Sequence, residues 1–186
     1  LLFKELLAKE VNVNVDDILH FDIFLYNRQE GYFWGNNDEF MSSCKLDDLQ
    51  CAYTTLMGFV KSNNPHNISV YCCFDNEEVG SRTSQGANST FLKDVLERIS
   101  KSLNKSEEEH HMALAKSFMV SADNAHAVHP NRPDITDQLN KVYMNKGIVI
   151  KFNAAQSYTS DSVSYAIFNK ICQNVDVPTQ VFTNKS

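Results

Sequence analysis

The stretch ISVYCCFDNEEVGSRTSQGANS, residues 68–89, decides the fold that this sequence predicts. Its first part, residues 68–74, is a short and mostly apolar run, which is typical of a buried strand. The residues that follow are polar and include Gly80 and Gly86, so they predict a loop at the end of that strand. A buried strand that runs into an acidic loop indicates a fold in which strands are covered by other elements.

Helical and strand patterns alternate on both sides of this strand. Apolar residues recur at helical spacing in three segments, residues 46–60, 92–103 and 163–171. Further strands are predicted over residues 117–122, 148–152 and 177–182. Such alternation predicts an α/β fold of three layers, with a mostly parallel sheet and helices on both of its faces.

The first forty residues read differently. Residues 1–9 resemble the end of a helix, and the alternation within residues 16–27 predicts a strand. Residues 27–40 are polar, contain glycines and are dotted with aromatic residues, which favours a loop at a domain junction. We therefore predict one domain that ends at residue 40 and a second that covers residues 41–186.

Composition and charge argue against several classes of function. The net charge of −6 disfavours a nucleic-acid partner, which would need a basic face. No apolar run approaches the roughly 18 residues of a membrane span, so no membrane partner is expected. The five cysteines are scattered, with no C-x-x-C pair, which predicts free thiols in a reducing compartment such as the cytoplasm. The chain lacks an initiator Met and a signal peptide, so we expect its start to lie within a longer protein.

Acidic residues cluster at three places in the predicted fold. The clusters are Asp47-Asp48 at a helix start, Glu77-Glu78 after a strand, and Asp123 after the next strand with His126 and His129 close behind. In open α/β sheets, sites gather beyond the carboxyl ends of the strands. Hydrolysis with two metal ions needs several carboxylate or imidazole ligands, one of them bridging, and a further carboxylate that takes a proton from water.

Each cluster also has a purely structural explanation. Asp47-Asp48 suit a helix cap, Glu77-Glu78 suit a solvated loop, and the Asp123 cluster suits a polar surface turn. A nucleotide-binding α/β domain is a further alternative, although the chain has neither G-x-G-x-x-G nor G-x-x-x-x-G-K-[ST]. Spacing alone therefore leaves the function open.

Longer strings in the sequence narrow the choice, because they resemble the M18 family of zinc metallopeptidases, the aspartyl aminopeptidases. FDNEEVGSRTSQGANS (residues 74–89) and SFMVSADNAHAVHPN (residues 117–131) are similar to the family's two long acidic signatures. KLDDLQCAYTTL (residues 45–56) and GIVIKFNAAQSYTSDSV (residues 147–163) are similar to two further conserved-pattern segments of the family. Residues 6–29 resemble the end of its inserted dimerisation or lid domain, so the likeness spans the chain.

The resemblance implies a role for each matching residue. Asp47 takes the position of the carboxylate that bridges two zinc ions. Glu78 and Asp123 take the positions of terminal ligands, one for each zinc ion. Glu77 takes the position of the general base and acid, and His126 that of a substrate contact.

The sequence departs from the family's pattern at several positions. Lys45 stands where the family usually has Arg, Asp48 where Asn is common, and Ser157 where Arg is usual. An upstream His-x-Asp segment and a downstream His, which complete the zinc ligands in the family, are not in these 186 residues. We therefore expect an incomplete zinc-exopeptidase-like catalytic domain, and we expect these residues alone to be inactive.

The resemblance further implies that the complete protein removes N-terminal Asp or Glu from peptides with two zinc ions. It implies a homo-oligomer, a dodecamer in the family, and a cytoplasmic protein, with delivery to the vacuole in some relatives. Two alternatives remain open. One is a related two-zinc aminopeptidase or deacylase of other specificity, and the other is a non-catalytic scaffold or assembly subunit.

Overall fold

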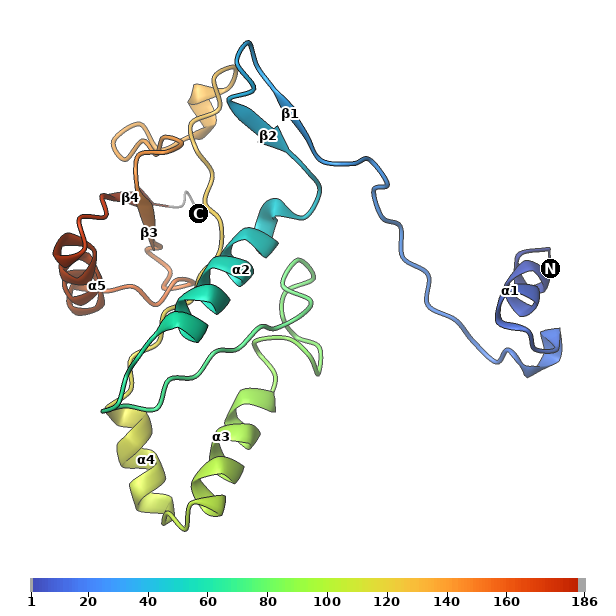
Figure 1. Ribbon diagram of the computed structural model, residues 1–186, viewed down its shortest axis with the longest axis horizontal. Helices are drawn as coiled ribbons and strands as arrows, with labels where there is room; N and C mark the ends of the chain where they lie inside the picture. Colours follow the sequence, from blue (N-terminus) through green and yellow to red (C-terminus); the bar gives the residue numbers. More distant parts are fainter. Residues whose placement is uncertain (1, 184–186) are drawn as a thin grey trace. The chain divides into compact units, whose positions relative to one another are not determined.

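The structure is a computed structural model that describes residues 2–183 (Figure 1). The chain divides into two compact units, Leu1–Leu46 and Asp47–Ser186. The assignment of residues 1–40 to an inserted domain and of residues 41–186 to a catalytic domain stays a prediction. The two units are described separately below.

The first unit contains one regular helix and one small hairpin. Its helices are α1 (Leu2–Val11) and the 3-10 turn η1 (Val15–Asp17). The strand predicted over residues 16–27 is wrong, because no strand forms within the described residues 18–31. Both alternating sets of side chains there are apolar, and neither finds a cover: Leu25 is fully exposed and Phe24 is 84% exposed. Alternation without a partner strand does not make a sheet.

A hairpin forms where a loop was predicted, within residues 27–40 and just beyond. Strand β1 (Tyr32–Trp34) pairs antiparallel with β2 (Phe40–Ser42). The Trp34 ring stacks on the Phe40 ring with centroids 4.6 Å apart, and the Trp34 indole N–H donates to Ser42 Oγ at 2.8 Å. The pairing depends on these cross-strand contacts, which the turn-rich sequence between the strands conceals.

The second unit contains four α-helices among its described residues. They are α2 (Leu46–Lys61), α3 (Phe91–Ser102), α4 (Glu107–Ala115) and α5 (Ser162–Asn174). The helices predicted from apolar spacing, over residues 46–60, 92–103 and 163–171, are confirmed with small shifts of their ends. Helix α4 escaped prediction because its residues show almost no apolar periodicity. Its signal is a capping box, in which Ser106 and Glu109 bond to each other's backbone N–H groups.

Strands β3 (Ile148–Phe152) and β4 (Thr179–Thr183) form a parallel pair, joined by α5, so this part is a β-α-β unit. Both strands were predicted, the second two residues too early. Gly147, at φ +115, lies just before β3, and a Cβ atom there would stand 2.2 Å from the carbonyl oxygen of Pro178. Glycine therefore lets the two strands approach, so that Ile148 N–H donates to Pro178 O at 2.9 Å.

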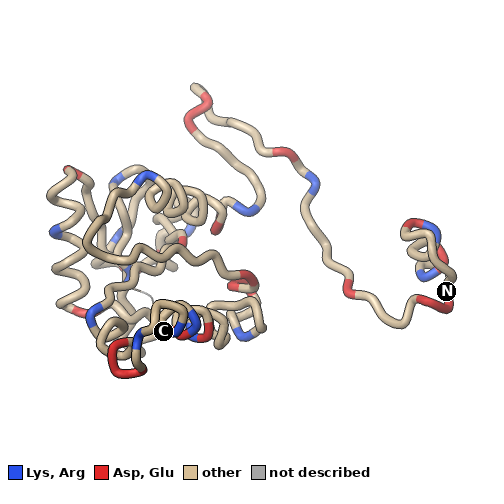
Figure 2. Tube along the Cα trace, turned by 60° about the horizontal axis from the view of Figure 1, so that its bottom comes forward, with Lys and Arg blue, Asp and Glu red and all other residues tan. Residues whose placement is uncertain are grey.

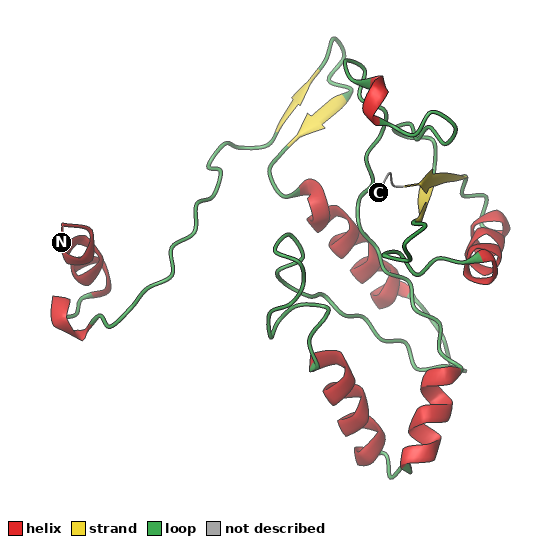
Figure 3. Ribbon diagram, turned by 180° about the vertical axis from the view of Figure 1, so that it is seen from behind, coloured by secondary structure: helices red, strands yellow, loops and turns green. Residues whose placement is uncertain are grey.

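The strands predicted over residues 68–74 and 117–122 are not formed, and this corrects the predicted single sheet. Both segments run extended, but the described part of the chain holds two separate two-stranded sheets instead (Figure 3). Their apolar side chains are largely exposed: Ile68 is 77% exposed and Met119 is 74% exposed. A strand needs a hydrogen-bonded neighbour, and neither segment has one among the described residues.

Few apolar side chains are buried. They are Ala8 in the first unit and Val142, Ile150 and Cys172 in the second. Acidic and basic residues alternate along both units and do not gather into one basic block (Figure 2). No helix in the described part of the chain combines the length and the apolar character that a membrane crossing requires.

Candidate metal centre

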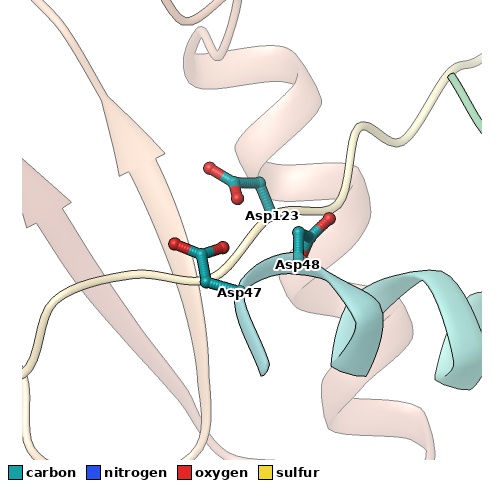
Figure 4. A group of neighbouring side chains, drawn as sticks. All are labelled: Asp47, Asp48 and Asp123. Carbon is teal, nitrogen blue, oxygen red and sulfur yellow. The ribbon is translucent and has the colours of Figure 1, made fainter. Parts of the chain in front are cut away.

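Three carboxylates from two distant segments meet in the second unit. Asp47 and Asp48 lie at the start of α2, and Asp123 follows the extended segment of residues 117–122 (Figure 4). Each offers one oxygen atom, and the three atoms all lie within 4.8 Å of one another. Oxygen atoms that converge in this way suit a metal ion. The first and third acidic clusters of the sequence therefore come together as predicted.

The start of α2 presents its two carboxylates in an irregular backbone. Asp47 (φ −88, ψ 110) and Asp48 (φ −120, ψ 25) are not helical, and the peptide bond between them is cis. Asp48 Oδ1 is buried and has no hydrogen-bond partner among the described residues. A helix cap would accept a backbone N–H with such an oxygen, so the geometry disfavours a cap and leaves room for a cation.

The loop that holds Glu77 and Glu78 is folded back on itself by backbone hydrogen bonds. Ser81 N–H donates to Asn76 O at 2.9 Å, and Asn88 N–H donates to Ser81 O at 3.0 Å. Gly86 lies so close to Ser81 that a Cβ atom there would stand 2.2 Å from the Ser81 carbonyl oxygen. These contacts shape the loop that follows residues 68–74, although that segment has no strand partner.

The electrostatics join this loop to the three-carboxylate group. Burial, and then the charge of Asp123, raises the pKa of Asp47. Burial, and then the charges of Asp123, Glu78, Asp47 and Asp48, raises the pKa of Glu77. Five carboxylates thus share one region of negative potential, which a multivalent cation would relieve. These residues therefore fit a metal centre by their donor chemistry, with carboxylate oxygen as the ligand that this chain provides.

The predicted site residues stand at three levels relative to this group. Asp47 and Asp123 are members of it, and so is Asp48, which the resemblance gave only as a departure from the family pattern. Glu77 and Glu78 lie within electrostatic reach of it but outside the atoms that meet within 4.8 Å. His126 is exposed and is not a member of the group, nor is any other imidazole among the described residues.

Lys151 is a neighbour that the sequence reasoning missed. Its ammonium group lies 2.7 Å from Asp123 Oδ2, donates to the carbonyl oxygen of Asn124 at 2.6 Å, and stands 5.6 Å from the centroid of the Tyr158 ring. The Lys151 side chain is only 16% exposed. Its signal in the sequence is a lysine inside the apolar strand β3, where a charge is held only by a partner.

Cys51 lies next to the same group. Its thiol donates to Asn124 Oδ1 at 3.3 Å. Burial, together with the neighbouring Asp48 carboxylate, raises the pKa of Cys51 to about 12. The sulfur is therefore protonated near neutral pH, so the group's negative charge comes from carboxylates and not from a thiolate.

Comparison with known proteins agrees with this site. The family model described as "Aminopeptidase I zinc metalloprotease (M18)" matches residues 1–186. The "Probable M18 family aminopeptidase 2" of Clostridium novyi is 49% identical over 180 residues, which cover 97% of this chain and 42% of the relative. The "Aspartyl aminopeptidase" of Caenorhabditis elegans is 35% identical over 185 residues, which cover 96% of this chain and 39% of the relative.

Solved structures give the same likeness. A chain in the cryo-EM structure of the Ape4 and Nbr1 complex has a TM-score of 0.82 and 37% identity, covering 100% of this chain and 37% of that one. The mApe1 dodecamer of S. cerevesiae has a TM-score of 0.76 and 26% identity, covering 97% of this chain and 43% of its own. The chain thus spans well under half the length of the proteins that it matches.

Proposed function

Since the chain belongs to the M18 family of aminopeptidases, we propose that the complete protein is a two-zinc aminopeptidase that removes N-terminal Asp or Glu from peptides. The observation that best supports this proposal is the convergence of Asp47, Asp48 and Asp123 on one point, with a lysine beside them. The likeness to a protein named aspartyl aminopeptidase supports the acidic specificity.

Asp47, Glu78 and Asp123 would hold the metal ions. Asp47 would bridge both ions, because it belongs to the group and shares its electrostatic field with carboxylates on both other segments. Asp123 and Glu78 would each hold one ion. The buried Asp48 Oδ1, which lacks a hydrogen-bond partner among the described residues, adds a fourth oxygen beside them. Zinc usually also takes imidazole nitrogen, which we propose that other parts of the complete protein provide.

Zinc ions bound there would polarise the scissile carbonyl group and make water a better nucleophile at neutral pH. The task of this chain's own residues is to place charge and move a proton. Glu77 lies outside the three-carboxylate group but within its electrostatic reach, so its carboxylate remains available to take a proton from the attacking water and to pass it to the leaving amine. His126, exposed after Asp123, would contact the peptide.

Lys151 would supply the acidic specificity. A cation within a strongly negative region attracts a substrate carboxylate that the rest of the region would repel. Lys151 holds this position, with its stem mostly buried and its ammonium group at Asp123. A neutral N-terminal side chain would gain nothing from this contact, so Lys151 would discriminate between substrates through their charge.

The complete protein would also share the architecture of its relatives. We propose that further segments pair with residues 68–74 and 117–122 to complete a three-layer sheet, because both segments are extended and apolar. We likewise propose a cytoplasmic homo-oligomer, and the likeness to a protein solved as a dodecamer supports the assembly.

Activity assays and metal analysis on the complete protein test this function. We expect about two zinc ions per chain, and faster cleavage of aspartyl and glutamyl amides than of alanyl or leucyl amides. Lys151→Ala should reduce kcat/KM for aspartyl substrates by about 10-fold to 100-fold, the range for loss of a charged hydrogen bond, with a smaller effect on alanyl substrates. A purified protein without zinc would favour the scaffold alternative, and a preference for neutral residues would favour another aminopeptidase specificity.

A further inference from the structure

Asn153 stands at a turn that connects the lysine of the site with an aromatic ring. It follows β3 directly and is 7% exposed, which is unusual for an amide side chain. Its Oδ1 accepts the backbone N–H of Ala155 at 2.8 Å and that of Ser157 at 3.4 Å. Its own carbonyl oxygen accepts the N–H of Gln156 at 3.0 Å. One residue thus holds three successive backbone groups of the turn.

The turn brings Lys151 and Tyr158 together. Lys151 lies two residues before Asn153 and Tyr158 lies five residues after it, yet the ammonium group stands 5.6 Å from the centroid of the phenol ring. This return requires a sharp change of chain direction, and Gln156 adopts a left-handed conformation at φ 58 to make it. A left-handed backbone at a residue other than glycine needs support from its surroundings, and the Asn153 amide provides hydrogen bonds on both sides of it.

We infer that Asn153 is a positioning residue for acidic substrate recognition: by fixing the turn of residues 153–158, it seats the Tyr158 ring beside Lys151 and so keeps the ammonium group at the carboxylate site. The inference rests on the proposed role of Lys151. A lysine stem has several freely rotating bonds, and a buried amide that restrains its neighbouring ring reduces the positions that the ammonium group can take. Asn153 itself touches neither the substrate nor the metal ligands.

The test compares four variants of the complete protein. Asn153→Ala removes the acceptor, and Asn153→Asp keeps an oxygen at its position. Asn169→Ala is the matched control, because Asn169 Oδ1 accepts the Thr179 hydroxyl at 2.7 Å within the same β-α-β unit and has no printed contact with the turn. Lys151→Ala reports on the underlying specificity. Each variant is measured for zinc content, melting temperature, and kcat and KM on aspartyl and alanyl p-nitroanilides.

Asn153→Ala should raise KM for the aspartyl substrate about threefold to tenfold, the range produced by losing a net hydrogen bond, with kcat within about twofold of wild type. The ratio of aspartyl to alanyl kcat/KM should fall by the same factor, while zinc content stays unchanged. Asn153→Asp should restore that ratio. Asn169→Ala should lower the melting temperature without changing the ratio, as a purely structural hydrogen bond would.

The outcomes separate this inference from the proposed function. If Lys151→Ala abolishes the preference for aspartyl substrates and folded, zinc-loaded Asn153→Ala retains it, the positioning role is wrong and the specificity role of Lys151 stands. If Lys151→Ala leaves the preference intact, both are wrong. Should Asn153→Ala fail to fold, Asn153→Ser provides the same comparison, with an intermediate KM expected, since a hydroxyl reaches only part of the way to the two N–H groups.

Discussion

At the scale of single residues, Glu77 offers the most direct test of the proposed mechanism. Glu77→Gln in the complete protein should reduce kcat at least about 100-fold, because general base catalysis contributes roughly 10²–10⁴-fold and an amide cannot accept the proton. The amide fills the same space, so zinc content should match that of the wild type. Steady-state kinetics and metal analysis on the same preparation provide the measurement. Near wild-type turnover would remove Glu77 from the mechanism.

Asp47 is distinguished from its neighbours by its proposed bridging role. A bridging carboxylate sets the distance between two cations and partly neutralises their repulsion. Asp47→Ala should therefore empty both zinc sites, whereas Glu78→Ala or Asp123→Ala should lower the zinc content by about one ion per chain.

Metal analysis of the three variants, with melting temperatures as a control, decides the role of Asp47. A helix cap would instead give a stability loss of about 0.5–2 kcal/mol with unchanged zinc. Full zinc occupancy in Asp47→Ala would therefore contradict the bridging assignment, whatever the two terminal-ligand variants show.

At the scale of elements, the N-terminus of α5 should be sensitive to acid. Asp161 caps this helix by accepting the N–H of Ser164 at 2.8 Å, and this bond, followed by the Ser164 side chain, holds the pKa of Asp161 below its ordinary value. A lowered folded-state pKa means that the stabilisation is present above the unfolded pKa of about 3.9 and is lost as the pH falls through the folded pKa.

Amide exchange at Ser164, corrected for the intrinsic exchange rate, measures this effect. Protection in the wild type should fall as the pH drops below about 4, where the free carboxyl group titrates. Asp161→Asn keeps a capping oxygen without a charge, so its protection should vary little with pH, and Asp161→Ala should be poorly protected throughout. Identical pH profiles for the wild type and Asp161→Asn would show that the carboxylate charge is irrelevant to the cap.

At the scale of the whole molecule, the 186 residues alone should lack peptidase activity. The group of Asp47, Asp48 and Asp123 offers only carboxylate oxygen, whereas zinc prefers a ligand set that includes imidazole and needs about four ligands per ion. Isothermal titration of these residues with zinc should show much weaker binding than the complete protein, and aspartyl p-nitroanilide should remain intact. Cleavage by the 186 residues, or two tightly held zinc ions, would contradict the proposed contribution of ligands from elsewhere.

The exposed apolar segments lead to a related expectation for the whole molecule. Residues 68–74 and 117–122 present unpaired backbone and apolar side chains, the combination that favours association between sheet edges. The complete protein, at more than twice the length in its relatives, would cover them. Much of the fold's stability therefore depends on contacts that a local pattern does not reveal.

The sequence by itself determined the features that depend on local pattern. Apolar spacing alone located α2, α3 and α5, since a helix satisfies its backbone hydrogen bonds internally. Strand β3 was located from its apolar run, and the acidic strings identified the family that the comparisons then established. Asp47 and Asp123 were chosen as candidate ligands from those strings, and they do lie together.

Tertiary structure decided everything that depends on a partner remote in sequence. Residues 68–74 have strand-like composition but form no strand, because ladder hydrogen bonds come from another segment and none is supplied within the described residues. The hairpin of β1 and β2 exists through the pairing of Trp34 with Phe40. Lys151 became a site residue only because β3 carries its ammonium group to Asp123, 28 residues earlier in the chain, where a buried cation finds the charge that stabilises it.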